Sequence, residues 1–287
     1  MEGENNRQAF QPIDLREVVG SKNKQLAKRL PGFMYRWLGK ILHINQINDF
    51  LREAGHLKGI PFINEVINNL NIKFEIHGEE NIPREGRYMF VSNHPLGGLD
   101  GVILLKLLNE KGGPTRVIIN DFLMAITPLA DWFVPVNKVG GQARDSIGAV
   151  EELYQSDDHV LIFPAGLCSR KIDGKIVDLQ WQKHFIQKAV KHQLDIVPIY
   201  FEGRNTNKFY NLAKIRKILN IKFNIEMMYL VDELYKHQNK AFKIHFGQAI
   251  SYKTFNRTVR PIEWADRVKR FVYRLPTTKE GRFSEVD

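Results

Sequence analysis

The sequence predicts an α/β fold, in which a mixed, largely parallel sheet of about seven strands is flanked by helices and preceded by a helical N-terminal segment. From residue 72 onward, short apolar runs alternate with amphipathic stretches that have helical spacing. The chain has 287 residues, of which 43% are hydrophobic, and this suffices for one large domain with an appendage. We therefore expect a helical segment over residues 1–71 and an α/β domain over residues 72–287.

The N-terminal segment combines apolar and basic residues. Residues 1 to about 20 are expected to be loosely ordered, whereas from Leu26 to Leu42 the apolar residues recur at helical spacing. A Pro-Gly pair at 31–32 divides this stretch, so two short helices are predicted, followed by helices over 46–57 and 61–70. Two interpretations fit the basic first pair: an anchor at a membrane interface, or helices packed on the domain with a solvated basic face.

The remaining elements follow from the alternating pattern. The predicted strands cover residues 73–77, 87–92, 116–120, 133–136, 159–163, 195–201 and 242–246. The predicted helices cover residues 102–108, 142–154, 181–192, 207–220 and 261–275. The helix over 207–220 carries several lysines and arginines beside an apolar side, which makes it a second candidate for contact with anionic lipid or an acidic carrier protein.

Charge and cysteine content narrow the class of protein. The formal net charge of +10 favours an anionic partner, but paired Cys/His zinc spacing and aromatic RNA-binding motifs are absent, so nucleic acid is not expected. The single cysteine, Cys168, permits no internal disulfide and fits a reducing compartment; we expect it to be a packed residue rather than a nucleophile. No run approaches the roughly 20 apolar residues that span a bilayer. No metal site is expected.

Residues 93–101, Asn-His-Pro-Leu-Gly-Gly-Leu-Asp-Gly, are the strongest candidate site. His94 follows a predicted buried strand, Asp100 begins a predicted helix, and Gly97 and Gly98 allow a sharp turn between them. Active sites of open α/β sheets lie at such strand ends. One interpretation is a catalytic pair, in which Asp100 orients the imidazole of His94 and the other ring nitrogen takes a proton from a hydroxyl. The other is a helix cap beside a strand-end histidine.

Four sequence blocks, in order, resemble the PlsC-like glycerolipid acyltransferases. They are residues 93–100, 134–138 (Val-Pro-Val-Asn-Lys), 163–170 (Phe-Pro-Ala-Gly-Leu-Cys-Ser-Arg) and 196–199 (Ile-Val-Pro-Ile), and the resemblance spans about residues 72–250. It implies that His94 and Asp100 are catalytic. It also implies an acyl donor that is an acyl carrier protein or CoA thioester, no resident cofactor and a lyso-lipid acceptor. The basic amphipathic segments at 26–42 and 207–219 predict a cytoplasmic protein attached to the anionic inner face of the cytoplasmic membrane.

Candidate substrate-binding residues surround this pair. Backbone amides near the loop glycines are candidates for an oxyanion site, and a Gly-Gly pair at 140–141 before a helix, with lysine and arginine nearby, is a candidate anion site. The arginine of the third block offers a fork of donors to an anionic group. The full set is Asn93, Gly97, Gly98, Lys138, Arg144, Gly166, Ser169 and Arg170.

Three departures from the usual family pattern bear on the acceptor. Five residues rather than four separate His94 from Asp100, Lys138 replaces the usual arginine of the second block, and Ala165 replaces the usual glutamate of the third. The form Asn-His-Pro-x-Gly-Gly-x-Asp-Gly resembles the hemolysin-like branch that O-acylates lyso-ornithine or lyso-glycine lipids. We therefore expect a lyso-aminolipid O-acyltransferase; the alternatives are a lysophosphatidate acyltransferase, a thioesterase, and a non-catalytic lipid- or carrier-binding protein on the same fold.

Overall fold

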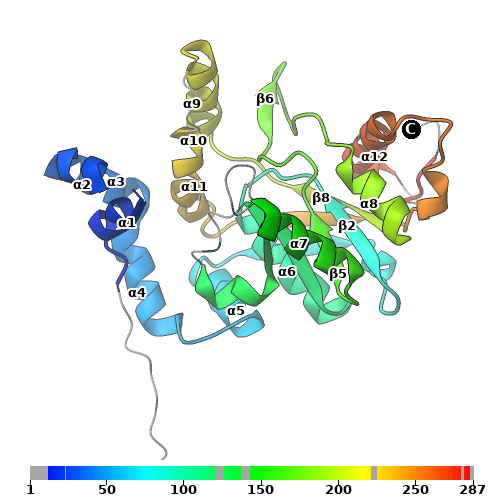
Figure 1. Cartoon of the computed structure of the whole chain (residues 1–287), viewed down its shortest axis with the longest axis horizontal. Coiled ribbons are helices and arrows are strands. Elements are labelled where there is room, and N and C mark those ends of the chain that lie inside the picture. Colours follow the sequence, from blue (N-terminus) through cyan, green and yellow to red (C-terminus); the bar gives the residue numbers. More distant parts are fainter. Residues whose placement is uncertain are drawn as a thin grey trace, which may run out of the picture.

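The computed structural model describes residues 12–22, 24–120, 124, 126–136, 143–220, 225–278 and 281–284. A twisted sheet forms its centre, helices cover both faces of the sheet, and the N-terminal helices α1–α4 extend away from it (Figure 1). The strands of the main sheet are β1 (Lys73–His77), β2 (Tyr88–Ser92), β3 (Thr115–Asn120), β4 (Phe133–Val136), β5 (His159–Ile162), β8 (Asp195–Glu202) and β9 (Ala241–Phe246).

The strand order is β1-β9-β8-β2-β5-β3-β4. The five strands from β8 to β4 are mutually parallel, whereas β9 pairs antiparallel with β8 and parallel with β1. Strand β2 therefore lies at the centre, between β8 and β5, with Phe90 opposite both Val197 and Leu161. The predicted fold class, a mixed and largely parallel sheet of about seven strands, is confirmed.

Helices connect and cover these strands. They are α1 (Leu15–Lys22), α2 (Lys24–Arg29), α3 (Gly32–Ile41), α4 (Ile44–Ala54), α5 (Ile60–Asn69), α6 (Leu99–Lys111), α7 (Ala143–Gln155), α8 (His184–His192), α9 (Asn207–Ile218), α10 (Ile225–Met228), α11 (Leu230–Lys236) and α12 (Pro261–Arg274). Short 3₁₀ turns lie at η1 (Glu79–Asn81), η3 (Thr127–Trp132), η4 (Tyr252–Thr254) and η5 (Leu275–Thr277). Among the described helices, none is long and apolar enough to cross a membrane.

Apolar side chains from β2 fill both faces of the sheet. Phe90 packs into one core cluster together with α5 and α6, whereas Met89 and Val91 pack into a second cluster with α8 and α12. All three residues have no exposed surface. A strand that is buried on both faces reads as a continuous apolar run, which is why β2 was recognisable in the sequence.

Helix α5 was predicted, and its residues Phe62, Ile63 and Ile67 join the core of the sheet. The structure differs from the sequence-based prediction in three places. Helix α1 occupies part of the region expected to be loosely ordered. A hairpin of β6 (Arg170–Ile172) and β7 (Lys175–Val177) was not predicted, because each strand has only three residues. Helices α10 and α11 were not predicted either.

Candidate active site

The loop from β2 to α6 lies at the carboxyl edge of the parallel strands, and Asp100 organises it. The Asp100 carboxylate is fully buried and accepts three backbone N–H bonds. Oδ2 accepts from Leu96 at 3.0 Å, and Oδ1 accepts from Gly98 at 3.1 Å and from Gly101 at 2.9 Å. A carboxylate at the first turn of a helix also interacts favourably with the helix dipole. Asp100 is thus held rigidly in its ionised form.

His94 donates from ring Nδ1 to Asp100 Oδ2, at 3.0 Å. The His94 side chain is 17% exposed, whereas Asp100 is fully enclosed. Since Nδ1 carries the proton in this arrangement, Nε2 holds the free lone pair, and it makes no hydrogen bond to another described residue. The predicted proximity of the two side chains is present, and the tautomer it selects suits proton abstraction at Nε2.

The pair shifts the pKa values of both groups. Burial alone would lower the pKa of His94, but the charge and hydrogen bond of Asp100 outweigh burial and raise that pKa above its usual value. Burial would conversely raise the pKa of Asp100, but the charge of His94, its hydrogen bond and the backbone N–H donors lower it. The protonated form of this imidazole is therefore stabilised by a neighbouring carboxylate.

The third sequence block packs directly against His94. The ring of Phe163 stacks on the imidazole, with 4.1 Å between ring centroids. The backbone N–H of Ser169 donates to the His94 carbonyl oxygen at 2.8 Å. These contacts confirm that β2 and β5 bring the first and third blocks together, as expected from their adjacent strands.

Ser169 makes its side-chain hydrogen bond within the protein. Its side chain is buried, and Oγ donates to Asp178 Oδ1 at 2.6 Å. Asp178 also accepts from the His94 backbone N–H at 3.3 Å. The hydroxyl of Ser169 therefore contacts an aspartate that sequence reasoning did not single out, and a role of Ser169 in substrate binding stays a prediction.

Asn93 is likewise buried, at 2% exposure, and both ends of its amide are used. Nδ2 donates to the Phe201 carbonyl at 3.0 Å, and Oδ1 accepts from the Phe201 N–H at 2.7 Å. Asn93 therefore ties the end of β2 to the end of β8. It acts on the site by fixing the residue before His94.

The three candidate glycines differ in what their amides do. The N–H of Gly98 donates to Asp100, and that of Gly166 donates to the Phe163 carbonyl at 3.0 Å. The N–H of Gly97 has no acceptor among the described residues, so it is the one of the three that remains for an oxyanion. Gly97 has φ +78°, and a Cβ there would lie 2.9 Å from Leu230 Cδ2, so a side chain is excluded at this position.

Arg170 lies beside the site, but its guanidinium is already paired. Nη2 donates to Glu226 Oε1 at 3.1 Å, and Nη1 donates to the Cys168 carbonyl at 2.7 Å. The fully buried Glu226 also binds Arg216, with 2.8 Å between Nε and Oε2. Two arginines share one carboxylate, so this group of three side chains carries a net positive charge, but the guanidinium of Arg170 is not the free anion contact that the sequence suggested.

The remaining candidates are Cys168, which is buried, and Lys138 and Arg144, whose side chains the structure does not describe. Cys168 is 1% exposed, and burial raises the pKa of its thiol to about 11, so it is a packed residue as expected. Lys138 lies outside the described residues, and Arg144 belongs to α7 but its side chain is not described. Their proposed role in anion binding stays a prediction. Within the part of the chain that the structure describes, no group of three His, Cys, Asp or Glu residues is placed to hold a metal ion.

Known acyltransferases resemble this chain along most of its length. A family model described as acyltransferase matches residues 17–278, which include the N-terminal helices. The lyso-glycine lipid O-acyltransferase of Bacteroides thetaiotaomicron is 45% identical over 264 residues, which cover 92% of this chain and 97% of that protein. The lyso-glycine lipid O-acyltransferase of Phocaeicola vulgatus is 44% identical, with coverage of 92% and 95%.

Among solved structures, the 1-acyl-sn-glycerophosphate acyltransferase PlsC from Thermotoga maritima aligns over 94% of this chain and 100% of its own, with 17% identity and a TM-score of 0.47. The two close sequence relatives and the family match define the class: this chain is an acyltransferase. It belongs to the acyltransferase family whose model covers residues 17–278, and the resemblance carried by the four sequence blocks is confirmed.

Proposed function

We propose that this enzyme transfers a fatty acyl chain from an acyl thioester to the hydroxyl of a lyso-lipid, and that the acceptor is a lyso-aminolipid of the lyso-glycine class. The single observation that carries the chemistry is the His94–Asp100 hydrogen bond, which leaves Nε2 as a base at the carboxyl edge of the sheet. The acceptor class is supported by the two lyso-glycine lipid O-acyltransferases, which align along nearly their whole length.

The reaction needs one base and no covalent enzyme intermediate. His94 Nε2 takes the proton of the acceptor hydroxyl, and the hydroxyl oxygen forms a bond to the thioester carbonyl carbon. Asp100 stabilises the resulting imidazolium. When the tetrahedral intermediate collapses, the carbon–sulfur bond breaks, and the imidazolium returns the proton to the departing thiolate. The products are an ester and a free thiol, so protons and electron pairs balance.

The oxyanion of the intermediate needs a donor on the same side as His94. The N–H of Gly97 is a suitable candidate, because its neighbours Leu96 and Gly98 both donate to Asp100 and so fix the peptide on each side. A rigid N–H aimed at a developing charge contributes more than a mobile one, since it costs no reorganisation during the reaction.

The third block supports an acceptor that does not need a carboxylate partner. Ala165 is 8% exposed and packs in the second core cluster with Trp181 and Phe185. A glutamate at this position would bring a charge into an apolar region, and alanine accepts no hydrogen bond from a glycerol hydroxyl. A lyso-aminolipid with a carboxylate headgroup requires basic partners instead, which Lys138 and Arg144 supply in this proposal.

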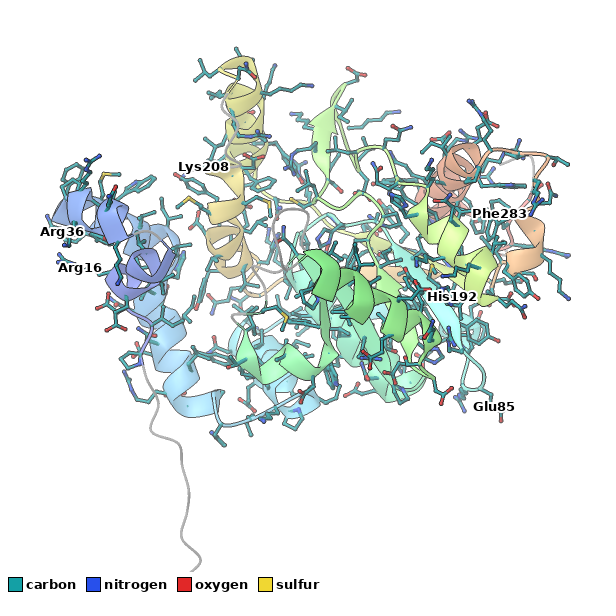
Figure 2. The ribbon with its side chains drawn as sticks, viewed as in Figure 1. Arg16, Arg36, Glu85, His192, Lys208 and Phe283 are labelled. Carbon is teal, nitrogen blue, oxygen red and sulfur yellow. The ribbon has the colours of Figure 1, made fainter. Side chains whose placement is uncertain are left out.

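The proposal includes attachment to an anionic membrane surface, where the lyso-lipid resides. Exposed large apolar side chains lie on α3, at Phe33 and Trp37, and at the end of α9. At α9 these are Ile215, Ile218 and Leu219, which are 52%, 71% and 62% exposed. Figure 1 shows α9 and the β6–β7 hairpin projecting from the same side of the molecule, and Figure 2 places Lys208 on α9 and Arg36 on α3. Apolar residues flanked by lysines are typical of a surface that enters the interface of an anionic leaflet.

The test is an assay of purified enzyme with defined substrates. Lyso-glycine lipid and lysophosphatidate are offered separately, each with acyl carrier protein and CoA thioesters of the same acyl chain, and products are identified by mass spectrometry. We expect ester formation with the lyso-glycine lipid to be faster. Faster turnover of lysophosphatidate would overturn the acceptor, free fatty acid as the main product would indicate a thioesterase, and no turnover with any pair would indicate a binding protein.

A further inference from the structure

Asp178 is a buried carboxylate behind the catalytic loop, and it accepts hydrogen bonds from three different segments. It is 1% exposed. Oδ1 accepts from the backbone N–H of His94 at 3.3 Å and from Ser169 Oγ at 2.6 Å, and Oδ2 accepts from Trp181 Nε1 at 2.8 Å. Burial raises the pKa of Asp178, and the hydrogen bonds from Ser169, Trp181 and His94 oppose that rise. Each donor is in turn fixed by the carboxylate.

These contacts hold the main chain of His94 on both sides. Its N–H donates to Asp178, and its carbonyl oxygen accepts from the N–H of Ser169, whose hydroxyl donates to the same oxygen of Asp178. His94, Ser169 and Asp178 are thus joined in a closed ring of three hydrogen bonds. The position of the imidazole relative to Asp100 depends on this ring, because the ring fixes where the His94 backbone lies.

Helix α12 holds Asp178 itself in place. The backbone N–H of Asp178 donates to Tyr273 Oη at 2.7 Å. Lys269 Nζ donates to the carbonyl oxygens of Asp178 and Leu179, at 2.7 and 3.0 Å. Lys269 also places a positive charge near the carboxylate, which offsets part of the cost of burying it. The last long helix of the chain is therefore connected to the catalytic loop through one aspartate.

We propose that Asp178 is a positioning residue for His94, whose carboxylate fixes the backbone of the base and joins the first and third sequence blocks. The inference rests on the proposed role of His94 as the base. A second consequence follows from charge: Asp178 is a second carboxylate near the imidazole, beside Asp100, whereas Arg170 is the nearby cation. Asp100 and Asp178 both raise the pKa of His94, and Arg170 lowers it.

The first experiment separates this role from general support of the fold. Asp178→Asn keeps the size of the side chain, removes the charge and cannot accept from all three donors. We expect kcat to fall on the order of 10²-fold with KM changed much less, because the base is misplaced while the substrate surface stays. We also expect the acid limb of the pH–kcat/KM profile to move to lower pH, since the loss of a negative charge lowers the pKa of His94.

The second experiment measures the pKa of His94 without any activity. NMR titration of labelled histidine in wild type and Asp178→Asn, with His94→Ala for assignment, should show a lower imidazole pKa in the variant. This readout stands even if the acyl-transfer proposal fails. If His94→Ala keeps activity while Asp178→Asn lowers the imidazole pKa, the proposed base is wrong and the charge coupling is right.

Two further variants complete the test. Asp173→Asn removes the same charge in the same segment, at the exposed turn of the β6–β7 hairpin, and should behave as wild type in both measurements. Ser169→Ala keeps the charge of Asp178 but removes one bond of the ring, so kcat should fall about tenfold without a downward move of the acid limb. If Asp178→Asn does not fold, Ser169→Ala decides alone. Unchanged kcat in the folded variants, or an Asp178→Asn profile with an unmoved acid limb, would overturn the proposal.

Discussion

His94, which is half-buried, and His159, which is buried, lie at opposite edges of the same sheet, and their pKa values shift in opposite directions because their partners differ. His159 begins β5 at the amino edge and is 3% exposed. Its Nδ1 accepts from the Tyr88 N–H at 3.1 Å, and its Nε2 donates to the Gly112 carbonyl at 3.3 Å. Both partners are neutral, so burial prevails and lowers the pKa of His159. His94 faces a carboxylate, which reverses the direction.

The comparison shows that burial alone does not leave a ring nitrogen available for proton transfer. His159 has both ring nitrogens occupied by backbone groups, so it has no lone pair to offer and serves to join two loops at the amino edge. His94 has one nitrogen bound and the other available. The difference lies in a single side chain, Asp100, and in the edge of the sheet where the loop opens.

The largest expected effect is that of His94→Ala. Removal of the general base should lower acyl transfer by on the order of 10³-fold or more, while the fold persists because the Asp100 carboxylate keeps its three backbone donors. Initial rates with a saturating acceptor, together with a circular dichroism spectrum, check both statements. Near-wild-type turnover would show that His94 is not the base and that its role, like that of His159, is structural.

Asp100→Asn should lower transfer by about 10²- to 10⁴-fold. The amide oxygen can still accept from Gly98 and Gly101, but the NH₂ group then faces the Leu96 N–H and His94 Nδ1. His94 Nδ1 becomes an acceptor, the proton moves to Nε2, and the base is lost. The pH dependence of kcat in this variant is the check: a rate equal to that of wild type at any pH would contradict the tautomer argument.

His159→Leu tests the other side of the comparison. The change leaves the Tyr88 N–H and the Gly112 carbonyl without their partners, and each unsatisfied buried group costs about 1–3 kcal/mol. Urea denaturation should therefore show a lower free energy of unfolding, while kcat per folded molecule stays within about twofold of wild type. A loss of kcat as large as that of Asp100→Asn would show that the amino edge takes part in the chemistry.

The pair also predicts how stability depends on pH. The pKa of His94 is raised on folding, so its pairing with Asp100 stabilises the native state fully below the usual histidine pKa of about 6.5 and less as pH rises through the raised value. The difference in unfolding free energy between wild type and His94→Ala should therefore be larger at pH 6 than at pH 9. Denaturant titrations at the two pH values measure it, and a difference that grows toward pH 9 would contradict the raised pKa.

The His94–Asp100 pair was predictable because both residues lie in one short loop between a buried strand and a helix. Asp178 and Glu226 were not predictable, because they reach the site from 84 and 56 residues away from their partners His94 and Arg170. Hydrophobic periodicity in the sequence does not predict a contact between residues so far apart in the chain. The same limit explains Ser169 and Arg170: their type suggested substrate contacts, whereas tertiary neighbours already occupy both side chains.

The sheet itself was largely predictable, since strands buried on both faces read as apolar runs, and β2, β5 and β8 fall within one or two residues of their predicted bounds. The hairpin β6–β7 has strands of three residues and mixed polarity, so no pattern distinguishes it from a loop. Helix α1 was missed because its sequence, Leu-Arg-Glu-Val-Val-Gly-Ser-Lys, contains glycine and β-branched residues that disfavour isolated helices.

The smallest expected effect concerns the outer surface of the carboxyl edge. Helix α9 packs beside the third block, where Phe209 and Tyr210 contact Cys168, and its far end exposes Ile215, Ile218 and Leu219. If this end enters an anionic leaflet, Lys217→Ala should weaken binding to vesicles containing anionic lipid by about fivefold, because a surface cation contributes roughly 1 kcal/mol there. The matched control is Arg84→Ala, an exposed cation in the loop before β2, at the amino edge.

Sedimentation with sucrose-loaded vesicles at low and high salt measures the difference between these two cations. Binding of wild type should fall as salt rises, since the Debye length shortens to about 3 Å at 1 M, and Lys217→Ala should lose part of that salt dependence whereas Arg84→Ala keeps it. Serine at positions 215, 218 and 219 should weaken binding without changing the salt dependence, because it removes apolar area and no charge. Equal losses for Lys217→Ala and Arg84→Ala would mean that net charge, and not the carboxyl edge, directs the enzyme to the membrane. The carboxyl and amino edges of the sheet would then contribute equally to membrane binding and would differ only in the ring nitrogen that His94 offers for proton transfer.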